Sequence, residues 1–204
     1  TIDGTNQSSA GVVVNSNGGS DTISLTSNSD GSLSKISLNG GSEIDQVNFE
    51  SELDFSLSDL TLTNIEILNF TGGTASTKIP SDVVSTKSYI LSKSGSNTLS
   101  IELIPKAQTI DLSSLTFDSS FVVGSDVIII DGTNFGQALN IIGTISNDEI
   151  TGTHSSGDTI SSGDGDDTLY GRDGNDTLTP GNGEDHVIPG MGNDTINLSE
   201  EISS

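Results

Sequence analysis

The chain has 204 residues, with six basic against 29 acidic residues and a formal net charge of −23. This balance argues against nucleic acid and anionic lipid as direct partners and favours cations. Aromatic residues make up only 4% of the chain, and tryptophan and cysteine are absent, so we expect short strands that bury Val, Ile and Leu, stabilised by metal rather than by disulfides.

The first 39 residues are rich in Ser, Thr, Asn and Gly, broken by short β-branched runs. Runs at residues 11–14 and 22–25 and the alternation of apolar and polar residues at 33–38 predict strands separated by turns.

The middle of the chain continues this pattern. Residues 54–70 alternate between apolar and polar side chains, which predicts strands rather than a helix. Further strands are predicted at 87–91 and 98–104. No helix longer than two turns is expected, with residues 81–85 and 199–202 as the candidates for short ones.

Three lysines, Lys78, Lys87 and Lys93, lie close together in this otherwise acidic chain. We interpret them as solvated charges at strand edges, which discourage edge pairing, with a docking point for an acidic partner as the alternative. The apolar run at 127–130 predicts a strand buried on both faces.

From Gly143 to Asn197 a phrase of nine residues recurs six times, once with an extra serine. The copies are GTISNDEIT, GTHSSGDTIS, SGDGDDTLY, GRDGNDTLT, PGNGEDHVI and PGMGNDTIN. The sixth place holds an aspartate: Asp148, Asp158, Asp167, Asp176, Asp185 and Asp194. An aliphatic residue follows two places later, and the last four copies have glycine at the fourth place (Gly165, Gly174, Gly183 and Gly192).

This phrase resembles the RTX calcium-binding nonapeptide, GGxGxDxUx with U apolar. The resemblance implies a parallel β-roll in which two phrases complete one coil. Alternate aspartates then share an edge: Asp148, Asp167 and Asp185 on one, and Asp158, Asp176 and Asp194 on the other. It also implies Ca²⁺ ions between successive turns. The ions are held by these aspartates and by turn carbonyls near Gly163, Gly165, Arg172, Gly174, Gly181, Gly183, Gly190 and Gly192, because calcium takes six to eight oxygen ligands.

Several copies depart from the motif. Arg172 replaces the second glycine, Pro180 and Pro189 replace the first, and Ser146 and Ser155 stand at the fourth place. We therefore expect the best sites around Asp167, Asp176 and Asp185 and the poorest near Asp148. Two earlier phrases, at residues 18–24 and 40–49, echo the repeat but lack its flanking glycine geometry, and are interpreted as structural turns.

Catalytic motifs do not occur in the sequence. The zinc-protease pattern HExxH and the nucleophile pattern GxSxG are absent, and the two histidines, His154 and His186, lie inside the repeats. We therefore do not expect an enzyme. Ice binding is disfavoured because the outward places of the repeat are charged and irregular.

The sequence thus predicts an all-β protein with a parallel β-roll at residues 143–197, continuing from a solenoid-like or sandwich-like β body at 1–142 and followed by a tail at 198–204. The start at Thr1 and the end SEEISS suggest a piece of a longer protein. We expect a calcium-stabilised structural module of a secreted bacterial cell-surface protein, exported by type I secretion and associating with other copies in an S-layer, without membrane insertion. The alternatives are the stalk or ligand-binding part of an adhesin, or the secretion tail of a toxin or hydrolase. The repeats are expected to be disordered without calcium.

Overall fold

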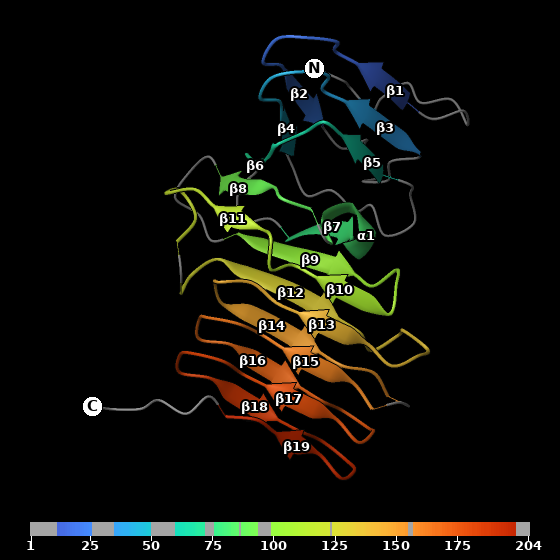
Figure 1. The fold of residues 1–204 in the computed structure, drawn as a ribbon, viewed down its shortest axis with the longest axis vertical. Helices are drawn as coiled ribbons and strands as arrows, with labels where there is room; N and C mark the ends of the chain where they lie inside the picture. The colour runs from blue at the N-terminus through green and yellow to red at the C-terminus, as the bar shows by residue number, and fades with distance from the viewer. Residues whose placement is uncertain are drawn as a thin grey trace.

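The computed structural model describes residues 12–25, 35–49, 60–71, 76–85, 87–93, 99–122, 124–154 and 157–198. These segments form parallel sheets stacked in one elongated solenoid (Figure 1). The residues 54–59, Ser155 and the helix candidate at 199–202 lie outside the described part of the chain.

The C-terminal coils are built from two parallel sheets that face each other. One contains β7 (Ser76–Pro80), β9 (Ser100–Ile104), β12 (Val127–Asp131), β14 (Asp148–Thr151), β16 (Thr168–Tyr170) and β18 (His186–Ile188). The other contains β10 (Thr109–Asp111), β13 (Asn140–Ile142), β15 (Thr159–Ser161), β17 (Thr177–Thr179) and β19 (Thr195–Ile196). Thr159 pairs with Thr177 and Thr168 with His186, so one coil consumes two nine-residue phrases, as predicted.

The N-terminal body is also a parallel solenoid, with longer coils. Its sheets are β1 (Val12–Asn15), β3 (Ile36–Asn39) and β5 (Leu60–Thr63), and β2 (Thr22–Leu25), β4 (Gln46–Phe49), β6 (Ile67–Phe70), β8 (Ile90–Lys93) and β11 (Thr116–Phe117). Of the two forms expected for the body, the structure has the solenoid and not the sandwich. The pairs of β12 with β14 and of β13 with β15 carry the sheets past residue 143 without interruption.

The single helix of the described segments, α1 (Ser81–Val84), is one turn long and lies where a short helix was expected. Among these segments no helix has the length and apolar character needed to cross a membrane.

Aliphatic side chains fill the interior of the coils except at the C-terminal end, where Val187 is only partly buried and Ile196 is exposed. The residues two places after the repeat aspartates, Ile150, Ile160, Leu169 and Leu178, are completely buried, as are Leu38, Val47 and Leu68 in the body. Phe49 and Phe70 stack with ring centroids 5.0 Å apart. The interior is continuous because each parallel strand places alternate side chains inside the coil.

One strand prediction is wrong in its burial. In β12, Ile128 and Ile130 are buried whereas Val127 and Ile129 are only partly so. The coil wall is one sheet thick, so a strand in it has a single inner face, and four consecutive apolar residues do not require burial on both.

The interpretation of the lysines as solvated charges is also wrong for Lys93. Its amine lies in the interior, 2.7 Å from Oδ1 and 2.6 Å from Oδ2 of Asp126, whose side chain is fully buried. Asp126 also accepts hydrogen bonds from the amides of Leu99 (2.7 Å) and Val122 (2.6 Å). Lys78 forms a partly exposed pair with Glu102 at 2.8 Å, and only Lys87 is a simple exposed charge.

Substituting Lys93 by methionine should destabilise the chain by about 3–5 kcal/mol, because it leaves the buried Asp126 carboxylate without its countercharge. Chemical denaturation followed by circular dichroism measures this. The exposed Lys87→Met is the matched control and should change stability by less than about 0.5 kcal/mol. Adding Asp126→Asn to Lys93→Met should restore part of the loss. Equal effects of the two lysine substitutions would contradict a buried ion pair.

Candidate metal centre

The turns of the last four repeat copies share one backbone conformation. Two residues spaced two apart have φ in the left-handed region, and an aspartate follows two places later. The sets are Gly163, Gly165 and Asp167; Arg172, Gly174 and Asp176; Gly181, Gly183 and Asp185; and Gly190, Gly192 and Asp194. Glycine adopts these angles without steric cost, whereas Arg172, at φ 76°, does not.

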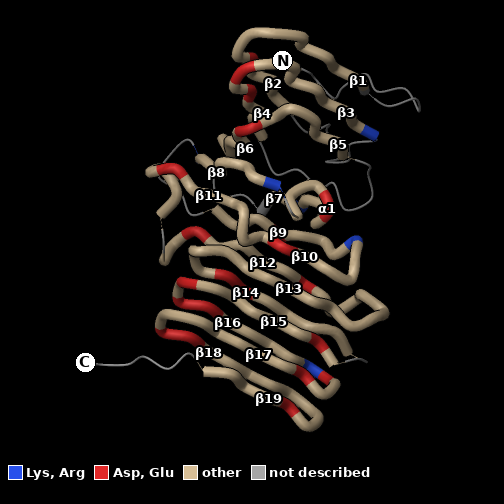
Figure 2. The backbone as a smooth tube through the Cα atoms, viewed as in Figure 1, with Lys and Arg blue, Asp and Glu red and all other residues tan. Residues whose placement is uncertain are grey.

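The glycines also let successive coils approach closely. A Cβ atom on Gly181 would lie 1.8 Å from the carbonyl oxygen of Gly163, and one on Gly190 would lie 1.8 Å from that of Arg172. The turn carbonyls of one coil are therefore packed directly against the turn of the next. Figure 2 shows that acidic residues gather at the turns on both edges of these coils.

The repeat aspartates form two ladders, one along each edge. Oδ1 of each of the last four aspartates accepts a hydrogen bond from the backbone amide of the aspartate one coil earlier. The distances are 2.8 Å for Asp148 to Asp167, 3.0 Å for Asp167 to Asp185, 2.7 Å for Asp158 to Asp176 and 2.9 Å for Asp176 to Asp194. The two-edge arrangement predicted from the repeat is confirmed.

The second carboxylate oxygens divide the aspartates into two groups. Asp167 and Asp176 are each only 1% exposed, and within the described segments the Oδ2 atom of each has no hydrogen-bond partner. A buried carboxylate oxygen without a partner is costly, and a cation between the coils would remove that cost.

In the first two copies the protein itself supplies the partner. Oδ2 of Asp148 accepts the amide of Thr144 (2.7 Å), and Oδ2 of Asp158 accepts the amide of Thr153 (2.6 Å). The Thr144 hydroxyl adds a further contact to Asp148 at 3.2 Å. These threonines occupy the second place of the phrase, where later copies have Gly163, Arg172, Gly181 and Gly190. Sequence reasoning missed their role, although the substitution at this place was visible.

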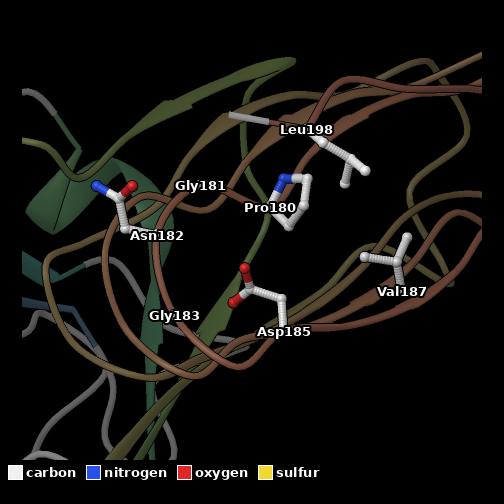
Figure 3. Close-up of a pocket in the computed structure, with 7 residues that line it drawn as sticks. All are labelled: Pro180, Gly181, Asn182, Gly183, Asp185, Val187 and Leu198. Carbon is white, nitrogen blue, oxygen red and sulfur yellow. The ribbon is translucent and has the colours of Figure 1, made fainter. Parts of the chain in front are cut away.

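The last turns are more open. A hollow of about 310 Å³ is bordered by the turn residues Pro180, Gly181 and Gly183 and by Asp185. Figure 3 shows the Asp185 carboxylate among these turn residues. The turn backbone and the aspartate thus face a shared space at this edge. Asp194 is partly buried at the opposite edge.

Burial changes the acidity of the ladders. It raises the pKa of Asp167 to about 6, with the Asp185 and Asp166 carboxylates adding to the effect. It also raises the pKa of Asp176, and that of Asp148 well above its ordinary value. A divalent cation would offset both the desolvation and the repulsion between carboxylates.

The donor set fits a hard cation. Among the described residues, no group of three or more His, Cys, Asp or Glu side chains is arranged to hold a metal, so backbone carbonyls must complete the coordination. Carboxylate and carbonyl oxygens suit calcium rather than zinc or copper. His154 Nδ1 lies 3.7 Å from Asp173 Oδ2 at the surface, and His186 is exposed, so neither histidine joins the ladders.

The family profile of the RTX calcium-binding nonapeptide repeat (4 copies) matches residues 153–187 and 161–196. Residues 153–196 are therefore RTX repeats, and calcium is the ion that such repeats bind. No curated protein and no solved structure matches the chain.

Calcium-depleted protein should gain strand structure as the pH falls from about 7 to about 4.5. The pKa of Asp167 rises from an ordinary 3.8 to about 6 on folding, so the folded chain binds the proton more tightly. The stability that this tighter proton binding adds is fully present below the ordinary pKa of 3.8. It is lost as the pH rises through the folded-state pKa of about 6. Circular dichroism measures the change, and Asp167→Asn should reduce it. Calcium affinity should fall over the same interval. A metal-free signal that stays flat or declines on acidification would contradict this.

Three Gly→Ala substitutions separate close packing from backbone strain. Gly136→Ala, with open space at its Cβ, should change stability by less than about 0.5 kcal/mol. Gly124→Ala, with φ +87° but open space, should cost about 1–2 kcal/mol. Gly181→Ala should cost more than either, because it adds an overlap with the Gly163 carbonyl. Denaturation in saturating calcium gives the ranking, and equal losses for Gly181→Ala and Gly124→Ala would disprove the packing role.

Proposed function

We propose that this chain is a calcium-stabilised structural module of a secreted bacterial cell-surface protein, and that it serves as a component of an S-layer lattice. The observation that carries the proposal is the pair of unpartnered, buried carboxylate oxygens of Asp167 and Asp176 between stacked coils. RTX repeats are calcium-binding modules of secreted bacterial proteins. In this chain, calcium completes the interior of a rod and makes it rigid outside the cell.

The ligands of the proposed ions are the ladder aspartates and the turn carbonyls. Asp167, Asp176, Asp185 and Asp194 supply carboxylate oxygens, and the turns at residues 163–165, 172–174, 181–183 and 190–192 supply carbonyls. Asp148 and Asp158 belong to the ladders but have protein partners for both oxygens, which supports a weaker role for them.

The proposed lattice role is supported by the exposed carboxylates on the surface of the rod. Asp164 and Glu184 are exposed and Asp173 is half exposed, and these carboxylates lie on turns outside the buried ladders. With a net charge of −23, copies of the chain repel one another, and calcium bridging between such carboxylates reduces the repulsion. The proposal therefore includes self-association at the cell surface after type I secretion.

An adhesin stalk is the second candidate, favoured by the elongated stack of coils (Figure 1). A stalk needs the same calcium-dependent rigidity but no contact between copies. A passive secretion tail would need neither calcium-dependent rigidity nor contact between copies.

Calcium titration of the whole chain, followed by circular dichroism and light scattering together, tests the proposal. Strand signal should rise from a metal-free state in which the repeats lack strand structure, because binding and folding of the repeats are one event, and particle size should rise with it. Magnesium at the same concentration is the control, since its strict octahedral geometry fits these turns poorly. Strand signal without growth in size would favour the stalk. A strand signal that does not rise when calcium is added would contradict the folding role.

A further inference from the structure

The N-terminal body repeats the turn conformation of the RTX coils. Asn17 (φ 76°) and Gly19 (φ 99°) precede Asp21, and Gly41 (φ 105°) and Glu43 (φ 79°) precede Asp45. The spacing is the same as in the RTX turns: two left-handed residues two apart, then an aspartate two places later. Both turns lie outside residues 153–196, which match the RTX profile.

The two N-terminal turns also stack as the RTX turns do. A Cβ on Gly41 would lie 1.7 Å from the carbonyl oxygen of Asn17, compared with 1.8 Å for Gly181 and Gly163. The amide of Ser42 donates to the Asn17 carbonyl at 3.1 Å, and the amide of Asn182 donates to that of Gly163 at 3.0 Å. The close contact between coils is therefore the same in both regions.

The carboxylates form the same kind of ladder. Asp45 Oδ1 accepts the amide of Asp21 at 2.8 Å, and Glu66 Oε2 accepts the amide of Asp45 at 2.9 Å. The amide of Gln46 then donates to the Asp21 carbonyl at 2.9 Å, as His186 does to Asp167 at 2.8 Å.

The second oxygen of Asp45 is the decisive feature. Asp45 is fully buried, and its Oδ2 has no hydrogen-bond partner. Oδ2 of Asp21 is buried and unpartnered as well. This is the condition of Asp167 and Asp176 in the RTX ladders. Gly40 lies over Asp45 Oδ2, where a Cβ would be 2.4 Å away, as Gly171 lies over Asp176 Oδ2 at 2.6 Å.

The chain itself contains the contrasting case. Asp126 has the same buried setting and accepts the amide of the preceding coil, but the amine of Lys93 neutralises it. Within the described segments, no lysine or arginine pairs with Asp45. A buried carboxylate in this position needs a cation, and here the protein does not provide one.

We propose that the first two described coils hold a second calcium site, separate from the RTX repeats, in which Asp21 and Asp45 supply carboxylate oxygens and the turns at residues 17–20 and 41–44 supply carbonyls. Carboxylate and carbonyl oxygens suit a hard divalent cation, and calcium tolerates irregular turn ligands better than magnesium, which demands near-ideal octahedral geometry. The site does not depend on the lattice role. The nonapeptide motif does not match this site, because Asn17 and Glu43 stand at positions where the motif has glycine.

Asp45→Asn in the full chain tests the site. Calcium bound per chain, measured by equilibrium dialysis, should fall by one ion relative to the wild type. Asp131→Asn is the matched control, since it removes one charge from an exposed turn aspartate and should leave the number of ions unchanged. A folded Asp45→Asn protein that binds as many ions as the wild type would overturn the proposal.

Hydrogen exchange read by mass spectrometry locates the site independently of that variant's folding. In the wild type, calcium should slow exchange in peptides covering residues 12–25 and 35–49. The same protection should persist when Asp167, Asp176, Asp185 and Asp194 are all changed to Asn, which disables the RTX ladders. Exchange in the two N-terminal peptides that does not respond to calcium would overturn the proposal, whatever the RTX coils do.

Discussion

The constraint on which the solenoid depends is the buried carboxylate that stands just before a strand and accepts the amide of the preceding coil. This hydrogen bond ties coil to coil, but it leaves a second oxygen inside the protein. The chain satisfies that oxygen in different ways. Lys93 pairs with Asp126, and the amide of Thr153 caps Asp158. Asp148 is a variant of the arrangement, because both of its carboxylate oxygens accept hydrogen bonds from Thr144. At Asp45, Asp167 and Asp176 no protein group within the described segments does so. A buried charge without a partner is strongly destabilising.

The different partners of the second carboxylate oxygen occur in different parts of the chain. The coils of the rod therefore depend on calcium to different degrees. Each coil contacts only its neighbours, so stability is set interface by interface, as in other repeat proteins. The central coils carry their own countercharge and caps and hold together through protein contacts alone. The coils on either side have carboxylates that need an ion. Removing calcium therefore loosens the rod from both sides toward a centre that retains its structure.

The sequence predicted much of this architecture because the repeat has strict spacing. Nine residues per phrase determine the coil length, the two edges and the buried aliphatic positions such as Leu169. The partner of Asp126 was not predictable, because Lys93 lies 33 residues earlier and the coil lengths of the body vary. The turns at Asp21 and Asp45 were interpreted as purely structural because the motif is written in glycines. The backbone requires only a left-handed φ, which Asn17 and Glu43 also adopt.

Burial also separates the two tasks proposed for calcium. Between coils, an ion meets carboxylates that have already lost their water and carbonyls held by the turn, so binding is coupled to folding and resists screening by salt. At the surface, Asp164 and Glu184 remain hydrated, and an ion bridging them to another copy competes with water and with dissolved salt. The interior sites therefore fill at lower calcium concentrations than the bridges. On the proposed function, the chain folds first and associates afterwards, so the surface that copies present to one another is already rigid when they meet.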